Sequence, residues 1–332
     1  MHGSFLRPDA PSRLRVSMES PISRRTFCHA IAAGASCVSL RRTTCAEDQP
    51  AGIRLSIGNY GMPHFTAEQA IRVIGDLGYD GIELSVMPTH PTSAEAITKD
   101  QRGPLHQLLA EKRLTLTSLM EHLPPSSVAA EHQTTLDRLK RAAELGRDLS
   151  PEAPPLIQTV IGGGTWEQKK DLFRDRLGDW LRVAEAEKTV IAIKPHRSGA
   201  MSKPSEAAWL LGQLGNSRWL GMAYDFSHYA LRDLNVSETI NDAFPSTALI
   251  VVKDVLQKEG QIEFGLPGEG HLIDHADILT SFYRRGYRGS VCCEVSVQVS
   301  RRTNYDAEAA AKSSYVFMNQ LLERAGIPRR PR

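Results

Sequence analysis

The sequence is poor in several features that would assign it to a special class of protein. It has no apolar run of the roughly 20 residues that a membrane-spanning helix needs, and it has only 5 cysteines. Its charge is nearly balanced, with 40 Lys and Arg against 38 Asp and Glu, whereas a nucleic-acid-binding surface needs clustered positive charge. The hydrophobic fraction of 41% and the charged fraction of 23% are those of an ordinary globular protein. Disorder, collagen and coiled coil are therefore excluded as descriptions of the whole chain.

The first 46 residues have the organisation of an export signal. The segment Ser-Arg-Arg-Thr-Phe at 23–27 resembles the twin-arginine signal. A weakly apolar stretch follows at 30–40, and the small residues around Ala46 favour cleavage after that residue. We therefore expect export of the folded chain to the bacterial periplasm, without a stable membrane anchor and with Met18 as a candidate start. A chance Arg-Arg pair before a small-residue helix is the alternative interpretation.

Removal of this segment changes the composition of what remains. Residues 1–46 contain seven Arg and two acidic residues, so their loss turns the net charge from +2 to −3. Three of the cysteines leave as well, and the remaining pair, Cys292 and Cys293, gives no disulfide framework. We accordingly divide the chain into a signal segment, 1–46, and one domain, 47–332.

The remainder alternates between strand and helix patterns. Short apolar runs predict strands at 53–57, 82–84, 114–118, 156–161, 190–194, 220–224, 248–252 and 290–295. Helical periodicity predicts helices at 66–77, 102–112, 131–146, 166–188, 203–214, 236–244, 274–285 and 306–325. Thr66 is expected to cap the first helix, and Gly146 to end the third. Eight strand–helix units predict an α/β fold, a single (β/α)8 TIM barrel.

Function in such a barrel lies at the C-terminal ends of the strands. Charged and imidazole side chains follow the predicted strands there, at Glu83, Glu121, His122, Lys194, His196, Asp225, His228, Lys253, Glu269 and Glu294. A carboxylate that ends an apolar strand is costly to bury without a partner. Several on one face therefore indicate a metal site or an acid/base pair.

Five short motifs carry a resemblance to a known family. They are Leu-Gly-Tyr-Asp-Gly-Ile-Glu-Leu at 77–84, Tyr-Asp-Phe-Ser-His at 224–228, Val-Lys-Asp at 252–254, Pro-Gly-Glu-Gly at 267–270 and Glu294. In this order, they make the chain from Ile53 to Gly326 resemble the xylose-isomerase-like TIM barrels, the sugar phosphate isomerases and epimerases. That family also includes hydroxypyruvate isomerases, inosose dehydratases and endonuclease IV.

The resemblance implies a divalent cation held by Glu after the fifth strand, Asp after the sixth, His on the seventh and Glu after the eighth. Asp225 and Glu294 match this pattern, but Lys194 replaces the first Glu and Val251 replaces the His. A lysine ammonium repels a metal ion and valine offers no lone pair. We therefore expect a divalent ion (Mn, Mg, Co or Zn) to bind weakly or not at all. A shifted metal site is the alternative, with candidate ligands His196, His228 and Glu269.

The family mechanism that the resemblance implies is removal of a proton next to a carbonyl. We predict Glu294 as the base, Lys194 as the positive charge that stabilises the developing oxyanion, and Asp225 as a further member of the catalytic group. The candidate substrate-binding residues are His228, His196, Glu83, His122, Lys253 and Glu269. Two alternatives for Lys194 are a Schiff base with the substrate and a purely structural ion pair.

The leading hypothesis is an exported isomerase or epimerase for a sugar or sugar derivative, with a homodimer as a compatible assembly. A lyase or dehydratase for an oxidised sugar is one alternative, and a non-catalytic carbohydrate-binding barrel is another. A nuclease is disfavoured, because the chain lacks key members of the His and carboxylate cluster that such chemistry uses and has no basic stripe.

Overall fold

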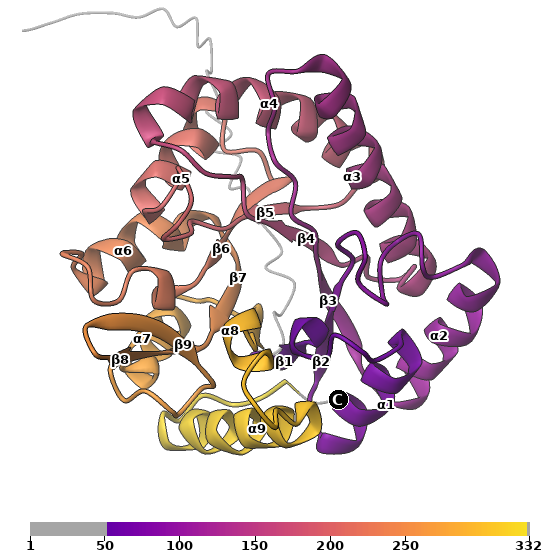
Figure 1. Cartoon of the computed structure of the whole chain (residues 1–332), viewed down its shortest axis with the longest axis vertical. Coiled ribbons are helices and arrows are strands. Elements are labelled where there is room, and N and C mark those ends of the chain that lie inside the picture. Colours follow the sequence, from indigo (N-terminus) through magenta and orange to yellow (C-terminus); the bar gives the residue numbers. More distant parts are fainter. Residues whose placement is uncertain (1–51, 331–332) are drawn as a thin grey trace, which may run out of the picture. The chain divides into compact units, whose positions relative to one another are not determined.

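The computed structural model describes residues 52–330, and the predicted signal segment 1–46 lies outside them. The described chain forms a closed barrel of parallel strands in the order β1-β10-β7-β6-β5-β4-β3-β2. The strands are β1 Arg54–Gly58, β2 Gly81–Ser85, β3 Thr115–Met120, β4 Leu156–Thr159, β5 Ile191–Ile193, β6 Leu220–Tyr224, β7 Thr247–Val252 and β10 Ser290–Cys293. Figure 1 looks along the barrel and shows the helices as a ring outside the strands. The predicted TIM barrel is confirmed.

Each predicted helix forms close to its expected bounds. The helices are α1 Ala67–Leu77, α2 Lys99–Glu111, α3 Ala129–Leu149, α4 Trp166–Glu187, α5 Pro204–Gln213, α6 Val236–Ala243, α7 His275–Arg284 and α9 Ala307–Arg324. Helix α1 begins where the sequence predicts, because Thr66 and Gln69 form a reciprocal capping box. Three short 3-10 helices join them, at Asn59–Gly61 (η1), Phe226–His228 (η2) and Phe244–Ser246 (η3).

The structure differs from the sequence prediction at two places. Helix α3 runs through Gly146 to Leu149, so the predicted helix end at Gly146 is wrong. A Cβ atom at position 146 would lie 2.9 Å from Pro155, which shows that glycine serves close packing of the helix on the loop before β4. The chain also forms elements that the pattern did not predict, the antiparallel hairpin of β8 Asp254–Lys258 and β9 Gln261–Gly265 and the short helix α8 Val297–Ser300.

Side chains alternate between the two faces of each barrel strand. One face packs against the helices and forms the large outer core. The other face forms a small apolar cluster of Ala192, Ala223, Leu249, Val251 and Cys292. Because the period is two residues, the next inward-facing positions toward the C-terminal ends are Lys194, Asp225, Lys253 and Glu294. The apolar cluster is thus the layer beneath a layer of four charged residues.

The two ends of the described chain lie side by side. Ile53 and Arg329 form an isolated parallel bridge, and the Arg330 amide donates to the Ile53 carbonyl at 2.7 Å. The Arg329 guanidinium binds both carboxylate oxygens of Asp80, at 2.6 and 3.0 Å. We call this arrangement the terminal clasp. None of the described helices has the length and hydrophobicity that crossing a membrane requires.

Candidate active site

A pocket of about 210 Å³ opens above the charged layer. It is lined by Tyr60, Met120, His122, Val160, Lys194, His196, His228, Lys253, Phe264, Glu294, Ser296, Val297 and Gln298. Six of the residues predicted from the sequence therefore meet in one pocket, and Asp225, fully buried, lies in contact with them. This is where the C-terminal ends of the strands converge, as expected for a barrel enzyme.

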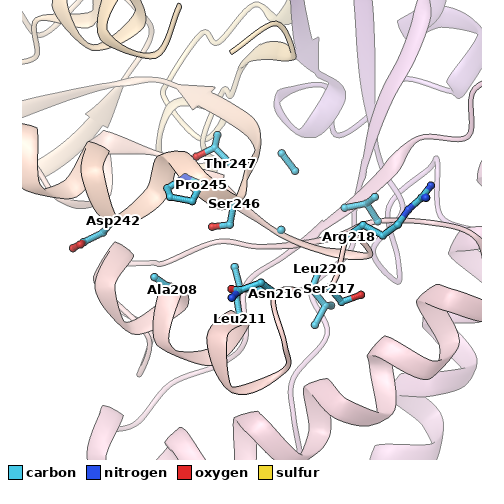
Figure 2. Close-up of a pocket in the computed structure, with 13 residues that line it drawn as sticks. Ala208, Leu211, Asn216, Ser217, Arg218, Leu220, Asp242, Pro245, Ser246 and Thr247 are labelled. Carbon is cyan, nitrogen blue, oxygen red and sulfur yellow. The ribbon is translucent and has the colours of Figure 1, made fainter. Parts of the chain in front are cut away.

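A larger hollow of about 680 Å³ lies near the N-terminal ends of β6 and β7 (Figure 2). Its two charged lining residues, Arg218 and Asp242, stand on opposite sides of the view in Figure 2. The smaller pocket instead brings together two lysines, three histidines and the Glu294 carboxylate. Because these groups could exchange protons with one substrate, we take this pocket as the candidate active site.

Two lysines and two carboxylates form a compact group on the pocket floor. Lys194 Nζ donates to Glu294 Oε2 at 2.5 Å, and Lys253 Nζ donates to Glu294 Oε1 at 2.8 Å. Lys253 also donates to Asp225 Oδ2, while Lys194 Nζ lies 3.8 Å from the same oxygen. All four side chains are buried, with Glu294 the most exposed at 6%. Each carboxylate is therefore matched by an ammonium group.

This pairing fixes the charge state of the group. Burial by itself would raise the pKa of Glu294, but Lys194 and Lys253 outweigh it and hold that pKa well below its usual range. The same two lysines and a hydrogen bond from Ser227 lower the pKa of Asp225 against the effect of burial. Burial would lower the pKa of Lys194, yet Glu294 and Asp225 raise it. Lys194 is consequently protonated, which speaks against the Schiff base, since that reaction needs a neutral amine.

Three histidines surround the group and are neutral. Burial and then Lys194 lower the pKa of both His122 and His196 to about 4. Burial and Lys253 hold the pKa of His228 well below its ordinary value. The rings of His196 and His228 lie 3.9 Å apart between centroids. Neutral imidazoles offer one donor and one acceptor each, which suits sugar hydroxyl groups.

Glu83 lies in the barrel interior, but it is not among the residues that line the pocket. Its Oε2 accepts hydrogen bonds from Ser118 Oγ at 2.7 Å and Gln158 Nε2 at 2.5 Å, while Oε1 is buried without a partner. Burial raises the pKa of Glu83 to about 7, although Ser118 and Lys194 act in the opposite direction. The structure thus shows Glu83, a predicted substrate-binding residue, as a buried acid that does not line the pocket.

The upper walls of the pocket come from the elements that the sequence pattern did not reveal. Phe264, on β9, places its ring 5.0 Å from Lys253 Nζ and 5.0 Å from the His228 ring. The Phe264 amide donates to Gln298 Oε1 on α8 at 2.7 Å, which ties the hairpin to that helix. Tyr60, in η1, completes the wall. The Gly at 260 followed by the alternating run Gln-Ile-Glu-Phe at 261–264 could have revealed the hairpin.

Two acidic residues from the sequence analysis lie outside the pocket. Glu269 accepts from the Arg302 guanidinium, at 3.0 Å for each carboxylate oxygen, and is not a lining residue. Glu121 is ion-paired with Arg138 on α3. Each of the two is therefore held in a local ion pair, and the substrate-binding role of Glu269 stays a prediction.

The residues present do not fit the cation of the ordinary family pattern. At the two departing positions Lys194 brings an ammonium group into contact with Glu294, and Val251 packs in the apolar cluster. Among residues 52–330, no three His, Cys, Asp or Glu side chains are arranged to hold a metal ion. Two of the four expected ligands are thus replaced, one by a cation and one by an alkyl group. Neither can donate a lone pair to a metal ion.

Comparisons with solved structures give the same fold. The epimerase YcjR from E. coli, a 3-keto-D-glucoside 4-epimerase, has a TM-score of 0.64 and 14% identity, covering 81% of this chain and 99% of its own. The IOLI protein with a bound zinc atom has a TM-score of 0.67 and 15% identity, covering 82% and 99%. AsbF from Bacillus anthracis, a probable 3-DHS dehydratase, has a TM-score of 0.63 and 15% identity, covering 80% and 99%. At such identities the likeness shows the fold alone.

No curated protein matches the chain. The model of one protein family, the xylose isomerase-like TIM barrel, does match it over residues 69–320. This match spans most of the barrel, from α1 into α9, and includes the strand ends that carry the charged group. The chain therefore belongs to the xylose isomerase-like TIM barrel family.

Proposed function

We propose that this protein is an isomerase or epimerase that moves a proton next to the carbonyl of a sugar or sugar derivative. The observation that carries the proposal is the position of Glu294, an ionised carboxylate on the pocket floor with one ammonium group bound to each oxygen. A base and two electrophilic donors that share one small pocket are the parts that enolisation needs.

The proposed reaction begins when the substrate carbonyl oxygen accepts hydrogen bonds from Lys194 and Lys253. Glu294 then removes the proton from the adjacent carbon. The C–H electron pair becomes the carbon–carbon double bond of an enediolate, and the carbonyl π pair moves to the oxygen. Return of the proton to the former carbonyl carbon, with transfer of the adjacent hydroxyl proton to the former carbonyl oxygen, gives an isomer. Delivery of a proton to the opposite face of the first carbon, by a pocket group other than Glu294, gives an epimer.

The lysines explain how a carboxylate of low pKa can act as the base. In the free site they hold the pKa of Glu294 down, which makes it a weak base. A carbonyl oxygen that accepts from the same ammonium groups draws them away from Glu294 and raises its basicity when the substrate is in place. The developing oxyanion strengthens these hydrogen bonds as the reaction proceeds.

The remaining pocket residues support binding. His122, His196 and His228 present neutral imidazoles to hydroxyl groups, and Phe264 and Tyr60 offer flat apolar surfaces to the carbon face of a sugar ring. Since the donor set does not fit a metal ion, we propose that the ammonium groups of Lys194 and Lys253 supply the positive charge in its place.

A dehydratase for an oxidised sugar is the second candidate. The same enolate would expel a hydroxide from the neighbouring carbon, and the protonated Lys194 in the pocket could supply the proton that turns it into water. The mass of the product distinguishes the two reactions, because dehydration gives a product lighter by one water molecule and isomerisation leaves the mass unchanged.

The test measures proton exchange, which occurs whichever product is formed. The chain is incubated in D2O with a panel of ketoses, aldoses and oxidised sugars, and NMR follows deuterium next to the carbonyl. For a substrate that exchanges, E294Q should lower the rate by roughly 10²–10⁴-fold, the usual contribution of a general base.

E68Q is the matched control, because Glu68 is an exposed carboxylate that pairs with Arg72 on α1 and does not line the pocket. Its exchange rate should equal that of the native chain. Equal rates for E294Q and the native chain would remove Glu294 from the mechanism. A sugar that binds the native chain without any exchange would favour the non-catalytic carbohydrate-binding barrel.

We also propose that the protein works outside the cytoplasm, in the bacterial periplasm. Support comes from the twin-arginine pattern at 23–27 and from the small residues that precede position 47.

A further inference from the structure

A hollow of about 590 Å³ lies at the N-terminal ends of β1, β7 and β10, at the opposite end of the barrel from the candidate active site. Three arginines line it, Arg54, Arg288 and Arg330, and no Asp or Glu is among the lining residues that the structure describes. Its volume is within the range of about 300–1,000 Å³ that small-molecule pockets have. The hollow therefore combines the size of a ligand pocket with charge of one sign.

Backbone pairing brings the three arginines together from separate segments of the chain. Arg54 is the first residue of β1, and its amide donates to the carbonyl of Gly289, which directly follows Arg288, at 3.2 Å. Arg330 belongs to the terminal clasp, where its amide donates to the Ile53 carbonyl, and its Nη2 atom donates to the Arg288 carbonyl at 2.6 Å. The sheet and the clasp thus hold the three residues together, although like charges at close range repel one another.

The positive charge of this cluster is not compensated by the protein itself. Within residues 52–330, none of the three guanidinium groups forms an ion pair, whereas the neighbouring Arg329 is paired with Asp80. Burial and then Arg330 lower the pKa of the Arg54 guanidinium, although Asp80 acts in the opposite direction. The Arg330 Nε atom is buried without an acceptor. Excess positive charge and unused donors in one hollow are the features of an anion-binding site.

The guanidinium groups have donors to offer to such an anion. The Arg54 side chain makes no hydrogen bond to any part of the chain that the structure describes. Arg288 uses Nη1 for the carbonyls of Tyr283 and Tyr287, at 2.7 and 2.8 Å, and its guanidinium lies 3.8 Å from the centroid of the Tyr283 ring. This stacking orients the planar group, and its other nitrogens remain available. The fork of a guanidinium matches two oxygens of a phosphate group.

Apolar side chains complete the walls of the hollow. Phe244, Ala248 and Tyr287 are among the lining residues. The Arg285 guanidinium lies 5.8 Å from the centroid of the Phe244 ring, which adds a fourth positive group beside the hollow. An aromatic ring next to a cluster of arginines suits a ligand that has both a carbon part and an anionic group.

We propose that this hollow binds a phosphate group, free or as the monoester of a small organic molecule, through Arg54, Arg288 and Arg330. A phosphate group carries up to two negative charges and several acceptor oxygens, so it can accept from more than one guanidinium at a time. Because the three arginines come from β1, from the loop before β10 and from the terminal clasp, the bound group links these segments and stabilises the folded chain.

The site is independent of the proposed reaction, because it lies at the other end of the barrel. Failure of the proton-exchange test would leave it unchanged, and absence of phosphate binding would leave the proposed reaction unchanged.

The test titrates sodium phosphate and phenyl phosphate into the full chain by calorimetry, with the ionic strength held constant by NaCl. We expect one site per chain and a melting temperature that rises with phosphate concentration. R54Q should weaken binding by roughly tenfold or more, because a charge-assisted contact is lost. Tighter binding of phenyl phosphate than of phosphate identifies the monoester as the ligand, and equal or weaker binding identifies the free ion.

R218Q is the matched control. Arg218 lines the adjoining hollow near the ends of β6 and β7 and stacks on Trp219 at 4.6 Å, so the variant removes the same charge from the same end of the barrel. Its phosphate affinity should equal that of the native chain. Since the Arg54 side chain makes no hydrogen bond within residues 52–330, R54Q should fold normally, and R288Q gives a second test with the same expected loss.

Three results would overturn the proposal. They are a native chain that shows no saturable phosphate binding, R54Q and R288Q chains that bind phosphate as the native chain does, and equal losses in R54Q and R218Q, which would assign the binding to diffuse surface charge.

Discussion

At the scale of single residues, the charged layer is a set of mutually dependent side chains. Asp225, Lys194, Lys253 and Glu294 are all buried, and each would be costly to bury alone. Removing one partner of such a pair typically costs about 3–5 kcal/mol, because an uncompensated charge remains. Substitutions here therefore change stability as well as activity, and each activity measurement needs a stability measurement beside it.

Glu83 leads to a prediction about pH. Its pKa is raised from an ordinary 4.5 to about 7 by burial, so between these pH values the folded state keeps a proton that the unfolded chain loses. Folding stability therefore falls as the pH rises through this window. E83Q has no proton to lose, so from pH 4.5 to about pH 8 its stability should improve relative to the native chain by on the order of 3 kcal/mol.

Urea unfolding of both chains at the two pH values measures this difference. E111Q, at an exposed position on α2, should show no such trend. If the difference in unfolding free energy between the native chain and E83Q did not change with pH, folding would not raise the pKa of Glu83.

The site was only partly predictable from the sequence. Strand-end positions identified Lys194, Asp225, Lys253 and Glu294, because a period of two fixes which residues face inward. The sequence could not show that both lysines bind the same carboxylate, Glu294, because that depends on how β5, β7 and β10 stand relative to one another. Likewise the Arg302 that binds Glu269 is 33 residues away along the chain.

At the scale of elements, Asp254 organises the loop that follows the hairpin. Its Oδ2 accepts from the amides of Gly268 and Gly270, at 2.8 and 3.0 Å, and its Oδ1 pairs with His275 Nε2 at 2.7 Å. A Cβ atom at position 270 would overlap the Val255 carbonyl oxygen, so glycine is required for this approach. The Asp of the Val-Lys-Asp motif thus has a structural role, next to the Lys that faces the pocket.

We expect D254A to destabilise the protein by about 2 kcal/mol, because it leaves two loop amides and a buried imidazole without their acceptor. Amide hydrogen exchange at 261–270 should become faster than in the native chain, while β6 and β10 stay protected. E263Q is the control on the same hairpin, since it removes only a solvent-exposed pair with Lys258 and should change stability by less than about 0.5 kcal/mol. Unchanged exchange in D254A would show that the loop is held by other contacts.

The elements that were missed have a common physical reason. The β8–β9 hairpin interrupts its apolar residues with polar ones, at six of the 12 positions from 254 to 265. It turns at Glu259 and Gly260, both with positive φ, which is the geometry of a two-residue hairpin turn. Short strands of this kind lack the apolar run that revealed the barrel strands. Gly146 shows the converse, since a residue that commonly ends helices serves helix–loop packing here.

At the scale of the whole molecule, the sequence predicts a chain that changes its net charge from +2 to −3 when the signal segment is removed. If the twin-arginine pattern directs export, the native chain should accumulate in the periplasm of a bacterial host without residues 1–46. Intact mass of the periplasmic protein measures the cleavage site.

The double variant R24K/R25K retains the charge of the segment and removes only the arginine pair, so it should remain in the cytoplasm at full length. An R41K/R42K chain is the matched control and should be exported as the native chain is. Export of R24K/R25K at the native level would contradict the proposed signal.

The terminal clasp and the pairing of β1 with β10 bear on how the protein is made. The first strand to leave the ribosome finds one neighbour, β2, at once, but its other neighbour is synthesised more than two hundred residues later. Until Ser290–Cys293 and then Arg329 emerge, the growing sheet has two open edges, which can pair with other chains and aggregate. Every product of translation that stops before β10 keeps these edges, so the sheet can close only once Ser290–Cys293 has been made.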